Sequence, residues 1–158
     1  MAKFLMTETI HSEKVLTTRL GQSGASNVYG VAEVGKAVKL TADSRYELCA
    51  LGDAIEGIVV SMLGGSFDGY SLGGIVQKGL KEVTFDGSQA AGTGAITVGT
   101  YVVVGTVVAK GTALTAALKV RSATDQAAAK AAPFKARVVS LGSAGTGAVG
   151  TTGLIEIL

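Results

Sequence analysis

Glycine-threonine pairs divide much of this chain into apolar segments that are too short for long helices. The pairs begin at positions 92, 99, 105, 111, 145 and 150 of the 158 residues. Glycine gives turns their backbone freedom, and the Val- and Ile-rich segments between the pairs favour strands. The six- to seven-residue spacing is similar to that of a hexapeptide β-helix, but the tract is too short and irregular for a stacked solenoid. We therefore predict a meander of short strands.

Strand signals recur along the chain from Lys36 onward. We expect strands over 37–41, 54–61, 75–77, 81–85, 95–98, 101–104, 107–109, 113–120, 134–141 and 153–158, with turns at Gly52-Asp53 and Asp86-Gly87. Short strands joined by glycine-rich turns indicate a small barrel or sandwich. The expected fold is therefore mainly β.

The segment 122–132 is the one helix candidate. Ser122 or Thr124 would cap it, Asp125 suits the first turn, and Pro133 would end it. An alanine-rich loop explains the same residues, so the fold contains at most one short helix.

Residues 1–35 differ in character from the rest of the chain. Residues 17–30 are rich in Gly, Ser, Thr and Asn and show no sustained hydrophobic period. This composition is typical of an extended arm that becomes ordered against a partner. We expect two parts: an N-terminal arm over 1–35 and a β-rich domain over 36–158.

A near-match to a phosphate-binding loop lies at 30–37, with the sequence GVAEVGKA. Phosphate-loop chemistry needs Ser or Thr after the lysine, because that hydroxyl holds the magnesium ion. Ala37 follows Lys36 instead, and a strand-like segment follows where a helix is required. We interpret the motif as a turn that leads into the first core strand.

Residues suited to catalysis or metal binding are scarce in this sequence. His11 is the only histidine and Cys49 the only cysteine; neither has the local neighbours that would activate it, and Cys49 is expected to be a small core residue. Asp53 and Glu56 are the closest acidic pair, without a third ligand nearby. We therefore predict no catalytic, cofactor-binding or metal-binding residues, and a protein that is not an enzyme.

The composition points to association with other protein chains. Charged residues make up 16% and hydrophobic residues 47% of the chain, against roughly 25% charged in ordinary soluble domains. Apolar surface on such a chain marks interaction sites. The net charge of +2 is too small to indicate nucleic acid, and the apolar runs are too short to cross a membrane. The basic residues between Lys119 and Arg137 are interpreted as a solvated face, with an acidic partner as the alternative.

Three core segments form a recognisable pattern: AVKLTA at 37–42, GDAIEGIV at 52–59 and AITVGTYVV at 95–103. Together they resemble the capsid decoration, or cement, proteins of tailed bacteriophages. In that family a strand leads to a Gly-Asp turn, a Gly-containing β-branched strand follows, and an Ile-Thr-x-Gly segment enters another strand. The resemblance covers roughly residues 36–120. The N-terminal arm has no counterpart in it, and residues 123–132 read as an insertion.

This resemblance implies a fold and a function. The fold would be a small β-barrel or β-tulip-like sandwich. The protein would be made in the host cytoplasm, assemble as a homotrimer, bind the major capsid protein on the outer surface of the virion and stabilise the expanded shell against internal DNA pressure. The alternative is a β-sandwich binding module of a phage fibre or carbohydrate-binding type.

Overall fold

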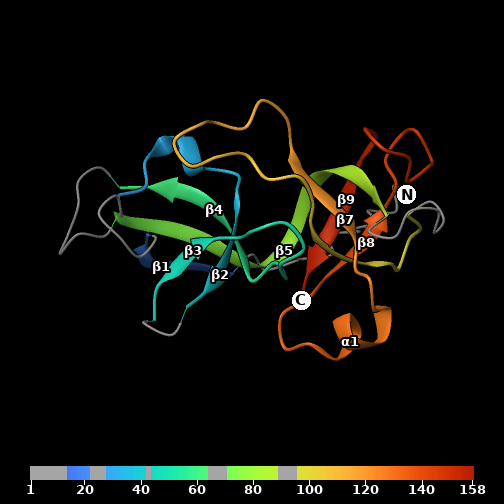
Figure 1. Ribbon diagram of the computed structural model, residues 1–158, viewed down its shortest axis with the longest axis horizontal. Helices are drawn as coiled ribbons and strands as arrows, with labels where there is room; N and C mark the ends of the chain where they lie inside the picture. The colour runs from blue at the N-terminus through green and yellow to red at the C-terminus, as the bar shows by residue number, and fades with distance from the viewer. Residues whose placement is uncertain (1–13, 22–27, 42–43, 64–70, 89–95) are drawn as a thin grey trace, which may run out of the picture.

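The computed structural model describes residues 14–21, 28–41, 44–63, 71–88 and 96–158. Its elements are β1 (Lys14–Leu20), the 3-10 turn η1 (Val31–Glu33), β2 (Ala37–Leu40), β3 (Tyr46–Leu48), β4 (Gly57–Met62), β5 (Ser71–Ser88), β6 (Tyr101–Val104), β7 (Leu118–Ser122), α1 (Gln126–Ala131), β8 (Ala136–Ser140) and β9 (Thr152–Ile157). The chain is mainly β and contains one short α-helix in this part (Figure 1). The predicted fold class is confirmed.

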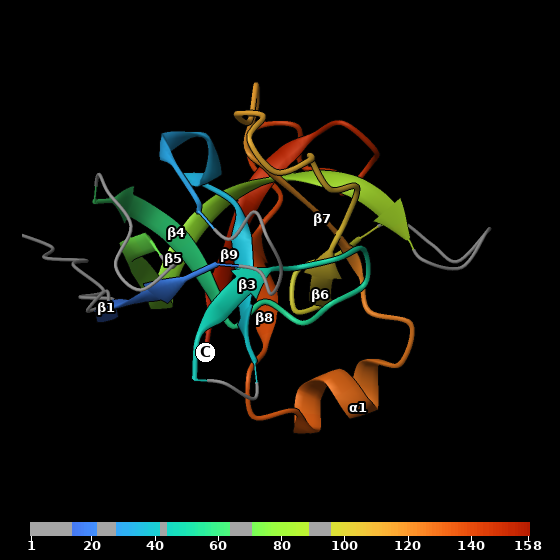
Figure 2. The same ribbon diagram turned by 60° about the vertical axis from the view of Figure 1, so that its left-hand side comes forward.

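The long strand β5 organises the whole molecule, because its two halves belong to two different closed circuits of strands. Its second half pairs with β7 and β9, and these join through β6 and β8 to close a five-stranded barrel. Its first half pairs with β1 and β4, and these join through β3 and β2. Figure 2 shows β5 curving from one circuit into the other.

Each circuit contains one parallel pair of strands, and geometry requires this. An antiparallel pairing reverses the strand direction, so a ring that closes must contain an even number of antiparallel pairs. A ring of five strands therefore needs a parallel pair, here β1–β3 in one circuit and β5–β7 in the other. Parallel partners cannot be joined by a tight hairpin and need a long crossover. The chain accordingly travels from Ser88 to Leu118 before it returns to β5.

Two apolar cores fill the two circuits. The larger contains inward-facing residues of the barrel, including Phe85, Val120 and Ile155, and also Cys49 and Ile58 from the other circuit. The smaller is built on Leu20, Tyr29, Val38, Tyr46, Val59 and Ile75. Ile58 and Val59 are consecutive residues of β4 that face opposite cores. Because side chains of β4 pack into both cores, this strand holds the two circuits side by side.

Several expected strands have different bounds in the structure. The segments 75–77 and 81–85 are parts of the single strand β5. The predicted turn at Asp86-Gly87 is wrong, because β5 continues through both residues to Ser88. Gly87 does have a positive φ of 88°, but it lies at a register irregularity between β5 and β7. The predicted strand at 107–109 is also wrong, because these residues belong to the loop between β6 and β7. Ile96 forms only an isolated bridge, to Gly147.

Helix α1 lies within the segment where a helix was one of two alternatives. It is shorter than the candidate segment and spans Gln126–Ala131. Asp125, not Ser122 or Thr124, is the N-cap: its carboxylate accepts hydrogen bonds from the amides of Ala127 and Ala128, both at 2.9 Å. A carboxylate at this position satisfies otherwise unpaired amides of the first turn.

The range expected to form an arm includes a strand and a buried tyrosine. Residues 1–13 and 22–27 lie outside the described part of the chain. Lys14–Leu20, however, pair with β5 over the whole length of β1, and Leu20 is buried. The arm interpretation is therefore wrong for residues 14–20 and for Tyr29. The strand was not predicted because alternate positions of β1 face solvent, as Thr17 and Arg19 do, and this made the sequence look polar and non-periodic.

Candidate functional site

The near-match to a phosphate-binding loop forms a compact turn. Glu33 N and Val34 N donate to the carbonyls of Gly30 and Val31, both at 3.1 Å. Gly35 has a φ of +89°, a conformation that glycine adopts readily. Its amide donates to Val59 O at 2.8 Å, and β2 begins two residues later. The interpretation as a turn leading into a core strand is confirmed.

Glu33 and Lys36 of this turn form a buried ion pair. Their exposed fractions are 1% and 4%, and Lys36 Nζ lies 3.5 Å from Glu33 Oε1. Burial alone would raise the pKa of Glu33, but hydrogen bonds from the amides of Gly111 and Gly30 and the charge of Lys36 together lower it. A buried charge is tolerated only when it is well paired, and every one of these partners supports the ionised carboxylate.

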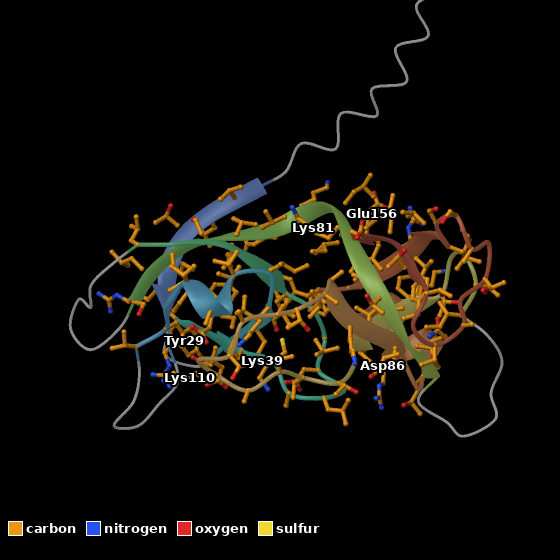
Figure 3. All side chains as sticks on the ribbon, turned by 90° about the horizontal axis from the view of Figure 1, so that it is seen from above. Tyr29, Lys39, Lys81, Asp86, Lys110 and Glu156 are labelled. Carbon is orange, nitrogen blue, oxygen red and sulfur yellow. The ribbon has the colours of Figure 1, made fainter. Side chains whose placement is uncertain are left out.

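Two partners of this ion pair come from the loop that joins β6 to β7 in the barrel, which we call the bridging loop (residues 105–117). Gly111 N donates to Glu33 Oε1 at 2.6 Å, and Lys36 Nζ donates to Ala109 O at 2.9 Å. Lys110 Nζ lies 5.5 Å from the centre of the Tyr29 ring, within the range of a cation–π contact. In Figure 3 the labelled Tyr29 and Lys110 lie side by side. The tip of the bridging loop is thus attached to η1 and its neighbours.

Asp86 fixes the start of the bridging loop. Its Oδ2 accepts from the amide and the hydroxyl of Thr106, both at 2.6 Å, and from Arg121 at 3.0 Å. Burial opposes ionisation, but the Thr106 and Arg121 hydrogen bonds outweigh it and lower the pKa of Asp86. Gly105 lies so close that an added Cβ would be 2.9 Å from Asp86 Cβ. The loop is therefore held both where it leaves β6 and at its tip.

An apolar groove runs along one side of the bridging loop. It has a volume of about 380 Å³ and is lined by Val34, Gly35 and Ile58–Val60, by Lys81 and Glu82 of β5, and by Leu114 and Ala116–Leu118. Leu114 packs so closely on Gly35 that a Cβ there would lie 3.1 Å from its methyl group. At the groove, the Val34 side chain is 36% exposed. This is an apolar surface accessible to another macromolecule.

The other residues considered for chemistry, Cys49, Asp53 and Glu56, each have their own environment in the fold. Cys49 is buried, and burial raises the pKa of its thiol. Asp53 Oδ2 lies 2.7 Å from Lys39 Nζ and accepts from Ala50 N, whereas Glu56 accepts from Leu40 N. His11 lies outside the described residues. The charges of Asp53 and Glu56 are close enough to help raise the pKa of the Cys49 thiol, but these three residues do not form a group that could hold a metal ion.

The described ranges contain neither a metal-binding cluster nor a helix that could span a membrane. No group of three or more His, Cys, Asp or Glu residues could hold a metal ion there. No helix in the same part of the chain is long and apolar enough to cross a membrane. The basic face is partly neutralised, since Arg121 pairs with Asp86 and Arg137 with Glu156 at 2.8 Å.

Sequence reasoning missed Glu33 and Asp86 as residues that hold the bridging loop. Glu33 did leave a signal, because an acid three residues before a lysine is placed to form an ion pair on a helical turn. Asp86 left none: its partners Thr106 and Arg121 are 20 and 35 residues away.

No family model, curated protein or solved structure is significantly similar to this chain.

Proposed function

We propose that this protein is a structural decoration, or cement, protein of a tailed-bacteriophage head and not an enzyme. It binds the major capsid protein on the outside of the expanded shell, as a homotrimer, and stabilises the shell against the pressure of packaged DNA. Two things support the proposal: the resemblance of segments 37–42, 52–59 and 95–103 to that family, and a surface suited to protein contact.

The observation that carries the proposal is the apolar groove beside the bridging loop. Val34 lines it with an exposed fraction of 36%, and Val31, three residues earlier in the chain, is 79% exposed. Burying one such side chain completely stabilises a complex by roughly 1.5–3 kcal/mol. Hydrophobic anchors near the centre of an interface commonly provide most of its binding energy. Lys81 and Glu82 at the groove add charges of both signs, which suit a protein partner better than a polyanion.

The described aromatic residues do not favour the alternative of a carbohydrate-binding module. Recognition of sugars by stacking needs exposed aromatic faces. Within the described ranges Tyr29, Tyr46 and Phe85 are buried, and Tyr101 and Phe134 are half-buried. Each of these rings therefore offers little free surface for stacking.

The binding test uses expanded phage heads prepared without the protein. We expect the purified protein to co-sediment with these heads and to protect them against heat and loss of DNA. Val34→Asp should reduce binding at least tenfold, since it places a charge where apolar surface must be buried. Val149→Asp is the matched control, because Val149 is 72% exposed and does not line the groove.

Two results would contradict the proposal. Failure of the wild-type protein to bind expanded heads would refute the proposed decoration function. Unchanged binding by the Val34 variant would show that the groove is not part of the interface. Sedimentation equilibrium tests the assembly state separately: we expect a trimer at micromolar concentration, and a monomer would refute the homotrimer.

A further inference from the structure

The ladder along one edge of β5 is interrupted in the middle of the strand. On the first edge, β1 pairs with residues 71–78 and β9 pairs with residues 79–84, so the partners follow one another without a break. On the second edge, β4 pairs with residues 73–76, and β7 joins only at Val83. Residues 77–82 therefore have no ladder partner on the second edge within the described part of the chain.

The backbone groups left open at this interruption belong to Leu80 and Glu82. Phe85 N donates to Thr151 O at 2.9 Å, so the backbone of Phe85 faces the edge of β5 that pairs with β9. Hydrogen-bonded and non-hydrogen-bonded pairs alternate along an antiparallel ladder. By this alternation Lys81 also faces β9, whereas Leu80 and Glu82 face the interrupted edge. No described residue pairs there with the backbone groups of Leu80 or with the amide of Glu82.

The apolar groove beside the bridging loop lies at this interruption. Ile58–Val60 line it where the β4 ladder ends, Leu118 lines it where the β7 ladder begins, and Lys81 and Glu82 line it between them. The bridging loop contributes residues of 114–117 to the same lining. Their backbone groups likewise form no hydrogen bond with any described residue. Two rows of unpaired backbone groups therefore border one groove.

The side chains at the groove define the chemistry of an occupant. Val34 is 36% exposed, and Val60 and Leu114 are half-buried, so the lining offers apolar contacts. Glu82 is exposed, and no described residue forms an ion pair with it. An opposite charge on a neighbouring strand is stabilising. An unpaired strand edge is a template for another extended chain, and the side chains beside the edge then select its sequence.

We propose that the groove binds an extended segment of another protein chain, which adds to the sheet between β4 and β7. The segment hydrogen-bonds to the open backbone groups of Leu80 and Glu82, places apolar side chains at alternate positions in the groove and carries Lys or Arg opposite Glu82. The inference rests on the proposed function only in taking this groove as the surface that meets the phage head.

The open edge itself is tested by amide hydrogen exchange of the full-length protein, followed by NMR. The amides of Leu80 and Glu82 should exchange about tenfold faster or more than those of Lys81 and Val83, which are bonded to β9. Equal protection of all four amides would overturn the open edge, because it would show that the Leu80 and Glu82 amides already have partners.

The occupant is tested by selecting binders from a library of random linear peptides on the immobilised protein. We expect the selected peptides to alternate apolar residues, to contain Lys or Arg, and to protect the amides of Leu80 and Glu82. Ala116→Trp should weaken their binding about tenfold or more, because the ring fills the groove. Ala113→Trp is the matched control, since Ala113 is exposed on the same loop but does not line the groove. Glu82→Lys should reverse the charge preference and select Asp or Glu.

Three results would overturn the inference. The first is a selection that yields no peptide able to distinguish the two tryptophan variants; Val34→Asp replaces Ala116→Trp if that variant fails to fold. The second is selected peptides without basic residues, which would remove the role of Glu82. The third is self-association that Ala116→Trp abolishes, because a second copy of this chain would then occupy the groove.

Expanded phage heads separate this inference from the proposed function. Hydrogen exchange followed by mass spectrometry reports on residues 80–82 in the head-bound protein. If the protein binds heads and these residues gain no protection, the inference is wrong and the decoration function stands. If the protein does not bind heads but binds groove-specific peptides, the decoration function is refuted and the inference is supported.

Discussion

Ser71 and Tyr29, 42 residues apart in sequence, exchange two hydrogen bonds. Tyr29 N donates to Ser71 Oγ, and Ser71 Oγ donates to Tyr29 O, both at 2.8 Å. The Tyr29 hydroxyl accepts from Leu48 N at 3.1 Å on β3. Tyr29 thus joins the start of β5 to β3, in the circuit where β1 and β3 share only the pair Leu20↔Tyr46. This tyrosine supplies a connection that the strand ladder itself lacks.

The first prediction follows from that arrangement. Ser71→Ala should lower the free energy of unfolding by about 1–3 kcal/mol, because it leaves the buried backbone groups of Tyr29 without their partner. Ser71 is fully buried. Urea denaturation measures the change, with Thr17→Ala on the exposed face of β1 as the control, expected within about 0.5 kcal/mol of wild type. Equal stabilities of the two variants would contradict the role of Ser71.

A second prediction concerns acid stability. The pKa of Glu33 is lowered below its ordinary value of 4.5, so the unfolded state binds the proton more readily than the folded state. The stabilisation from Glu33 is therefore complete above about pH 4.5 and is lost as the pH falls through the lower folded-state pKa. Glu33→Gln should be less stable at pH 7, and the difference from wild type should shrink in acid. Asp86→Asn should behave in the same direction, since the pKa of Asp86 is also lowered. A difference that stays constant from pH 7 to pH 2 would refute this.

The third prediction separates two N-terminal truncations. Deleting residues 1–13 should leave a folded core, because β1 begins at Lys14. Deleting residues 1–30 should abolish cooperative unfolding, since it removes β1 and Tyr29 and so opens the circuit that they close. Circular dichroism during thermal unfolding distinguishes the two. If the longer deletion unfolds cooperatively near the wild-type temperature, β1 contributes little. Within the proposed decoration function, we expect the shorter deletion to weaken binding to heads.

A fourth prediction compares neighbouring valines of β6. Val102 is buried at 3% exposure and belongs to the barrel core, whereas Val103 faces outward and is half-buried. Val102→Asp should prevent folding because it buries an unpaired carboxylate. Val103→Asp should fold, with a moderate loss of stability, and Arg121 opposite it offers a compensating charge. Comparable soluble, folded yields for both variants would show that the side-chain alternation is misassigned.

The fifth prediction concerns the Cys49 thiol. Burial raises its pKa, so almost no thiolate is present at neutral pH. A disulfide reagent should label the native protein only as fast as it unfolds, and labelling should become rapid in denaturant. Cys49→Ala should cost about 1–2 kcal/mol of stability through lost packing. Rapid labelling of the native protein would show that Cys49 is accessible in the folded state and would contradict this prediction.

The sequence alone determined the secondary structure where local chemistry is decisive. The alternation in Ala37–Leu40, the Gly52 turn, the β-branched run of β6 and the closing strands β8 and β9 could be predicted, because each depends on side chains a few residues apart. The apolar composition also predicted that Cys49 is a core residue. Local composition gave the wrong prediction for β1, because a strand with one solvated face and two threonines resembles a loop in sequence until its partner β5 is known.

Only the tertiary structure decided how the strands close and where the candidate site lies. The division of β5 between two circuits depends on pairings with β1, β4, β7 and β9, none of which has a local sequence signature. The contacts Glu33–Gly111 and Lys36–Ala109 join residues 78 and 73 positions apart. Glu33 and Lys36 bind backbone groups in these contacts, and every residue carries such groups. No pattern of side chains in the sequence therefore predicts the contacts. The charged pair becomes buried, and the groove beside the bridging loop forms, only once residues from both circuits have come together.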